Sequence, residues 1–302
     1  MAEDAYMIFF VLSQLSFMFR TLCNKEYTRH FSSPASNILF NVIGLGVTFL
    51  ISLIFKGAAL PPSPAYLLLC LLFGTIFAVV VMLMLVCYSK GPLGQVNLVF
   101  QMCTLVPVVF GILVFHEAFN WQKGLGLALM LVVFVLSFLN SKAGDPSSDR
   151  VFVPAKVWMP VTVLTMLLNG CLSTIQNSAV QLFPETKILT FNFWSFLFGT
   201  LILIVIYVIY RLGHEADPLI KQQPVKFYTL ALVCGMLSSG GNIFIMYALK
   251  TIPSTVAYPL LACINTVALH IDGLVFYKDA RTRYGLAMIL IGLVSIVLLN
   301  IA

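Results

Sequence analysis

The feature that most constrains the fold of this chain is a succession of long apolar segments. Runs of about 17 to 24 residues, the length of a membrane-spanning helix, follow one another with short polar connections. They cover residues 5–22, 36–55, 65–87, 92–115, 124–140, 157–180, 188–210, 227–249, 254–277 and 284–302. Their length and continuous hydrophobicity favour helices over barrel strands, which are shorter and alternate in character. We therefore predict an all-α polytopic membrane protein with ten transmembrane helices.

The composition agrees with a membrane protein. Only 9% of the residues are charged, against about a quarter in a soluble domain. The net charge of +6 comes from Lys and Arg scattered singly between apolar runs, which is typical of membrane loops and predicts no nucleic-acid partner. The seven cysteines have no metal-site spacing, so we interpret them as packing residues and predict no metal and no cofactor. The acidic start "MAEDAYMIFF" is unlike a secretory signal and predicts a retained first span.

An internal repeat organises the chain. The stretch "GPLGQVNLVFQMCTLVPVVFGILVFHEAFNWQKGLGLALML" aligns at a constant offset of 161 with "IPSTVAYPLLACINTVALHIDGLVFYKDARTRYGLAMILIG". Pro92, Phe115 and Gly124 thereby pair with identical residues in the second copy. We predict a first repeat over 1–141, a polar linker over 142–156 and a second repeat over 157–302. Because each repeat holds five helices, an odd number, the two insert with opposite orientation. This is the plan of secondary transporters, whose substrate site lies between the repeats near the midplane.

The positive-inside rule predicts the orientation of the chain. Four of the 17 Lys and Arg residues fall in the even-numbered connections, and thirteen fall in the odd-numbered ones. The odd connections are therefore expected in the cytoplasm, which places both termini outside.

Several stretches resemble a known transporter family. They are "GILVFHEAF" with "GLGLALMLVVFVL", "GLVFYKDAR" with "GLAMILIGLVSIVLL", and "MYALKTIPSTVAYPLL". These resemble the EamA-type family of the drug/metabolite transporter superfamily, and the likeness extends over both halves of the chain. It implies ten helices in two inverted bundles and alternating-access transport of small metabolites. Glu117 stands where the family's corner usually has glutamate, and Asp279 stands in the second copy.

Two features depart from that family's pattern. Its members are usually described with both termini in the cytoplasm, whereas the charges of this chain predict the reverse. The smaller four-helix relatives carry a membrane-embedded glutamate in their first helix for proton coupling. The first span here has no acid before Arg20, so any proton coupling must use another residue.

Polar residues follow one face of the fourth and ninth apolar segments. In the ninth, Tyr258, Asn265 and Asp272 are seven residues apart, and such positions lie on nearly the same side of a helix. Asn97, Gln101 and Thr104 form a similar stripe in the fourth. Such polar faces either join helices by hydrogen bonds or line a wet cavity. Their presence in both repeats favours a cavity.

Two other segments carry polar residues at helical spacing. Asn169, Ser173 and Gln176 share a face of the sixth segment, and Asn242 ends the mid-span stretch "SSGGN" in the eighth. They are candidates for the same cavity or for helix packing. The predicted substrate-binding residues are Asn97, Gln101, Thr104, Asn169, Gln176, Asn242, Tyr258 and Asn265.

Ionisable residues within the ninth segment need a separate explanation. Asp272 lies about 9 Å along the axis from the corner at Lys278. A charged acid inside a span costs about 2.5–3.5 kcal/mol and tends to mark a pathway or a proton relay. His270 lies about 200° around the helix from Asp272, so the two do not form a direct pair. We predict Asp272 and His270 as the candidate proton-coupling residues, with an acid paired at the membrane interface as the alternative for Asp272.

Together these features predict a secondary active transporter, or permease, and not an enzyme. It would move a small organic metabolite, such as an amino acid, nucleoside or drug-like solute, across the plasma membrane by alternating access, with protons as the candidate coupling ion. The alternative is a flippase for a lipid-linked carrier. A membrane-embedded enzyme would need convergent catalytic side chains, which the sequence lacks outside the ninth segment, and no GxxxxGK[ST] motif indicates ATP-driven transport. The expected partners are the solute, the lipid bilayer and protons, with the chain acting as a monomer or homodimer.

Overall fold

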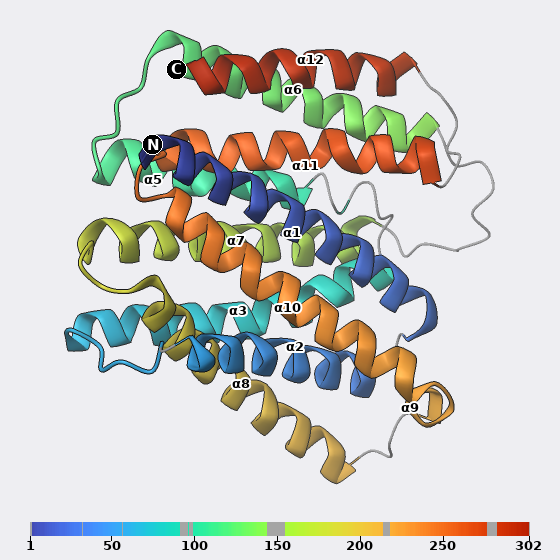
Figure 1. Ribbon diagram of the computed structural model, residues 1–302. Coiled ribbons are helices and arrows are strands. Elements are labelled where there is room, and N and C mark those ends of the chain that lie inside the picture. Colours follow the sequence, from blue (N-terminus) through green and yellow to red (C-terminus); the bar gives the residue numbers. More distant parts are fainter. Residues whose placement is uncertain are drawn as a thin grey trace. The chain divides into compact units, whose positions relative to one another are not determined.

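Where the structure describes the predicted apolar segments, they are mainly helical (Figure 1). The computed structural model describes residues 2–31, 33–55, 57–90, 96, 99–143, 155–213, 218–276 and 283–301. In chain order the elements are α1 (Ala2–His30), α2 (Pro34–Ile54), α3 (Pro64–Lys90), the 3₁₀ turn η1 (Met102–Thr104), α5 (Leu105–Val114), α6 (Trp121–Ala143), α7 (Ala155–Leu182), α8 (Ile188–Gly213), α9 (Pro218–Gln222), α10 (Pro224–Ala248), α11 (Ser254–Phe276) and α12 (Arg283–Ile301). The described residues contain no strand, so the predicted all-α class is confirmed.

Six helices are long and apolar enough to cross a bilayer by length and composition, among the residues that the structure describes. They are Met7–Thr28, Pro34–Ile54, Pro64–Cys87, Lys156–Leu182, Ile188–Gly213 and Pro224–Ala248. Shorter apolar helices cover Val99–Val114, Trp121–Leu136, Ser254–Ala268 and Arg283–Leu299. The chain is therefore a multi-pass membrane protein, and the number of ten spans stays a prediction.

Helix α1 is longer than the segment predicted over 5–22, because its polar end has partners in the fold. The ring of Tyr27 is fully buried and stacks on Phe40, with 3.9 Å between the ring centroids. The carboxylate of the preceding residue, Glu26, forms an ion pair of 2.9 Å with the Nζ of Lys226 on α10. These contacts stabilise the helical conformation of a polar stretch whose composition alone predicts a loop.

The helix predicted over 92–115 is interrupted by the 3₁₀ turn η1 just before α5. The cause is Pro107, the third residue of α5. Proline has no N–H to donate to the carbonyl of Cys103, four residues earlier, and its ring crowds that turn. Tighter 3₁₀ hydrogen bonding is a common response at such a position.

The chain divides into two compact units. Unit 1 contains Met1–Leu85 and Ile175–Thr251, and unit 2 contains Val86–Thr174 and Ile252–Ala302. Each unit therefore draws on both halves of the sequence. This division differs from the repeats predicted over 1–141 and 157–302, which stay a prediction.

In unit 1 the helices approach closely at glycines. Helix α10 packs against α1 and α2, and α2 packs against α8. A Cβ added at Gly235 would lie 2.8 Å from the carbonyl oxygen of Gly44, so α10 and α2 touch backbone to backbone. A Cβ added at Gly74 would overlap the Ser195 carbonyl and lie 2.9 Å from the Gly199 nitrogen. Small residues allow this close packing between membrane helices.

This packing predicts different outcomes for two glycine substitutions in unit 1. Gly74→Ala is expected to destabilise the protein by about 1–3 kcal/mol, because the new methyl meets rigid backbone of α8. Gly46→Ala is the matched control, because its Cβ would make only a 3.8 Å contact with Thr200 Cγ2 and alanine favours a helix. Thermal unfolding in detergent measures both. Equal midpoints for the two variants would contradict the packing at Gly74.

Unit 2 is built from α5, α6, α11, α12 and most of α7. Helix α12 packs along α6, and α11 contacts α5, α6 and α12. The Ser295 hydroxyl of α12 donates a hydrogen bond of 2.8 Å to the carbonyl oxygen of Gly126 on α6. The apolar core between these helices includes Met130, Val133, Phe134, Ala262, Cys263 and Met288. The offset of 161 relates α6 to α12 and α5 to the second half of α11, so helices in equivalent positions of the sequence pack on each other.

Candidate functional site

Polar side chains of unit 2 meet where α7, η1 and α11 come together. The Asn169 amide nitrogen on α7 donates to the sulfur of Cys103 in η1, with an N–S distance of 3.1 Å. The Tyr258 hydroxyl on α11 donates to the carbonyl oxygen of Ser173 on α7, with an O–O distance of 2.8 Å. Asn169 lies at the middle of the candidate span Lys156–Leu182. We call the four residues Cys103, Asn169, Ser173 and Tyr258 the unit 2 polar cluster.

The cluster depends on a close approach of α7 to η1 and α5 at Gly170. A Cβ added there would lie 2.8 Å from the carbonyl oxygen of Cys103 and within van der Waals overlap of the Val106 side chain. Gly170 therefore brings the neighbouring Asn169 within reach of η1.

Exposure separates the predicted unit 2 residues into two groups. Gln101, Asn169 and Asn265 are half-buried. Thr104 and Tyr258 are each only 4% exposed. The Thr104 hydroxyl donates to the carbonyl oxygen of Gln101 within its own turn, and Tyr258 is engaged with α7 as described above. Tyr258 thus joins α11 to α7, whereas Thr104 is bonded within its own turn.

The structure does not describe the side chains of three predicted residues. Asn97 lies outside the described residues. His270 and Asp272 belong to α11, but their side chains lie outside what the structure describes. Their predicted roles stay predictions.

The other two predicted residues lie in unit 1 and bind each other. The Gln176 amide nitrogen on α7 donates to the Asn242 amide oxygen on α10 at 2.8 Å. Asn242 in turn donates to the carbonyl oxygen of Ser238 at 2.7 Å. Both side chains are buried. In this conformation the pair connects α7 with α10, which is the helix-joining role that polar residues often take in membranes.

Unit 1 also buries polar atoms that sequence reasoning missed. The amide oxygens of Asn177 and Asn192 and the hydroxyl of Ser239 are buried without a hydrogen-bond partner among the described residues. Asn192 donates through its nitrogen to the carbonyl oxygen of Ile188 at 3.2 Å. An unpaired acceptor in an apolar medium is costly. The signal of these atoms in the sequence is a polar residue within an apolar run.

The contacts of Glu117 were also not predicted from the sequence. Its carboxylate accepts hydrogen bonds from the backbone nitrogen of Ser254 at 3.1 Å, from the Ser254 hydroxyl at 2.7 Å and from the backbone nitrogen of Thr255 at 2.9 Å. Glu117 thus caps the start of α11, where the first N–H groups lack helical acceptors and the helix dipole favours an anion.

Local backbone geometry brings Glu117 to that position. His116 adopts a left-handed conformation with φ of 52°, which turns the chain at the end of α5. The Glu117 nitrogen then donates to the carbonyl oxygen of Gly111 at 3.1 Å. A Cβ added at Gly111 would lie 2.6 Å from the Ser254 hydroxyl, so this glycine leaves the space that the cap occupies.

The chemistry of the site is that of neutral hydrogen-bonding groups. The placed candidate residues are amides and hydroxyls, and the described residues contain no group of three or more His, Cys, Asp or Glu side chains that is able to hold a metal ion. Such groups recognise the polar atoms of a solute by hydrogen bonds.

Residues 157–301 match the model of the EamA-like transporter family. The second half of the chain belongs to this family. The match covers the second predicted repeat, and it confirms the resemblance seen in the sequence. EamA-like proteins are transporters of the drug/metabolite superfamily, and the multi-pass architecture of this chain agrees with that family.

A solved structure supports the fold of the EamA-like chain. A protein described only as "Crystal structure of protein" is 13% identical in sequence, with a TM-score of 0.68 over 99% of this chain and 97% of that chain. At this identity the likeness shows the fold alone. No protein among the curated sequences matches this chain.

Proposed function

We propose that this EamA-like protein is a secondary active transporter that moves a small organic metabolite across the plasma membrane by alternating access. Asn169 carries the proposal. Its half-buried amide stands at the middle of a membrane span and is held in the unit 2 polar cluster. A polar group is costly at that depth unless it faces protein or a cavity, and transporters of this class keep their sites near the midplane.

The packing of equivalent helices supports the two-repeat plan on which this proposal rests. Helices α6 and α12, which the offset of 161 relates, contact each other, and so do α5 and α11. This is the pattern that ten helices in two inverted repeats would produce. We further propose that both termini lie outside the cytoplasm, which C-terminal reporter fusions test.

The half-buried amides also suggest the class of solute. Gln101, Asn169 and Asn265 offer both donors and acceptors, which suit a solute that carries N–H or O–H groups as well as acceptor atoms. We propose a neutral or zwitterionic solute, with Asp272 and His270 as the candidate coupling residues if protons drive its movement.

Uptake into proteoliposomes tests this function directly. Amino acids, nucleosides and drug-like amines are screened with and without a pH gradient. Asn169→Ala and Asn265→Ala are expected to lower uptake of the transported solute by about tenfold or more, because a lost hydrogen bond to a polar solute costs about 1–3 kcal/mol. Gln222→Ala is the matched amide control, since Gln222 is exposed on α9. Full uptake in both asparagine variants would exclude the proposed site.

A further inference from the structure

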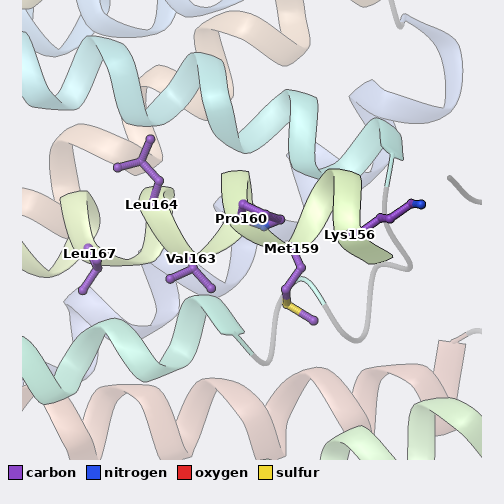
Figure 2. Close-up of a pocket in the computed structure, with 6 residues that line it drawn as sticks. All are labelled: Lys156, Met159, Pro160, Val163, Leu164 and Leu167. Atoms are coloured by element: carbon purple, nitrogen blue, oxygen red, sulfur yellow. The ribbon is translucent and has the colours of Figure 1, made fainter. Parts of the chain in front are cut away.

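The first half of α7 carries an open groove on one face. Lys156, Met159, Pro160, Val163, Leu164 and Leu167 line a cavity of about 640 Å³ (Figure 2). Their spacing keeps them on one side of the helix, with Lys156 at one end of the row and Leu167 at the other (Figure 2). Leu164 is 51% exposed and Leu167 is 47% exposed, whereas Thr162 and Thr165 on the other side of α7 are fully buried.

The length of the groove matches one leaflet of a bilayer. The candidate span of α7 begins at Lys156, which places this residue near the lipid headgroups. From Lys156 to Leu167 the helix rises about 16 Å, roughly half of the apolar thickness of a bilayer. The apolar face below the lysine therefore reaches about as far as a single acyl chain of that leaflet.

Charge at the headgroup end favours an anion. Lys156 is exposed, and the first turn of α7 contains no acidic residue. No carboxylate in the part of the chain that the structure describes forms an ion pair with Lys156. The unpaired N–H groups of the helix start add positive potential at the same level. Pro160 also has no N–H to donate to the carbonyl of Lys156, which leaves that carbonyl open to a headgroup hydroxyl.

We propose that this face of α7 binds an anionic phospholipid. The phosphate lies against the Lys156 ammonium, and one acyl chain follows Met159, Val163 and Leu167 toward the midplane. A zwitterionic lipid makes the same apolar contacts, but it carries no net charge for the lysine to attract. With odd connections in the cytoplasm, the bound lipid belongs to the inner leaflet, where anionic lipids give the surface its negative potential. The proposal does not depend on which solute is transported.

Native mass spectrometry of the full-length protein in detergent tests this site. Phosphatidylglycerol and phosphatidylcholine with identical acyl chains are titrated separately. Wild type is expected to bind phosphatidylglycerol about fivefold more tightly, the preference that one lysine near a membrane surface provides. Lys156→Ala should abolish that preference, and Lys156→Arg should retain it. Lys221→Ala on α9 is the matched control and should leave it unchanged, since Lys221 is exposed in unit 1.

A second variant tests the apolar part of the groove separately from the charge. Val163→Trp fills the cavity and is expected to weaken binding of both lipids severalfold while their ratio stays near that of wild type. Thermal unfolding confirms that each variant is folded before its lipid binding is compared. Equal affinity of wild type for the two lipids, or an undiminished preference in Lys156→Ala, would overturn the proposal.

Discussion

Glu117→Ala is expected to lower the stability of unit 2 by about 2–4 kcal/mol. The substitution removes an acceptor of three hydrogen bonds from the start of α11. Hydrogen bonds to a charged group contribute about 1.5–3 kcal/mol each, and the loss of a helix cap costs about 1 kcal/mol. The partial exposure of Glu117 keeps the total below their sum. Ser254 and Thr255 are both fully buried, so water does not readily replace the carboxylate.

Thermal unfolding in detergent measures this effect, and the choice of variants separates charge from hydrogen bonding. Glu117→Gln keeps an acceptor oxygen but removes the charge, so its unfolding midpoint should lie between those of wild type and the alanine variant. Glu185→Ala is the matched control, because Glu185 is an exposed acid in the loop between α7 and α8. A Glu117→Ala midpoint equal to that of Glu185→Ala would refute the capping role.

Asp272→Asn is expected to abolish accumulation of solute driven by a pH gradient, if protons are the coupling ion as proposed. The amide has nearly the same shape as the carboxyl but does not take up or release a proton at physiological pH. Gradient-driven uptake should fall by about tenfold or more, while exchange of solute without a gradient persists, because exchange needs the site but no net proton movement.

Paired uptake and exchange assays in proteoliposomes distinguish coupling from folding for Asp272. Glu185→Gln serves as the control for loss of an acid elsewhere. Loss of both uptake and exchange in Asp272→Asn would assign the residue to binding or structure. An unchanged response to the pH gradient would remove Asp272 as the coupling residue.

The helices could be predicted from the sequence because lipid imposes a minimum apolar length on each of them. The ends of the helices were less predictable. The continuation of α1 to His30 depends on the buried ring of Tyr27 and on Lys226, which lies far along the chain. The 3₁₀ turn at η1 had a local signal in Pro107, which the apolar pattern around it obscured.

The candidate site was predictable in its residue types and much less so in its contacts. Helical spacing selected Asn169, Ser173 and Tyr258, and the structure joins the last two by a hydrogen bond. Spacing does not reveal which side chains of different helices meet. The bond from Gln176 to Asn242 spans 66 residues, and the bonds of Glu117 to Ser254 span 137. Such pairs are determined by tertiary packing, which one sequence does not encode in a local pattern.

Each unit contains segments from both halves of the sequence, so the two units are completed at different times during translation. Unit 1 has all its residues once Thr251 has been made, whereas unit 2 also needs Ile252–Ala302. Helices α5 and α6 are therefore translated long before α11 and α12, their partners, emerge. During that interval α5 and α6 lack the helices against which they pack in unit 2, and the apolar core that includes Met130, Ala262 and Met288 cannot form.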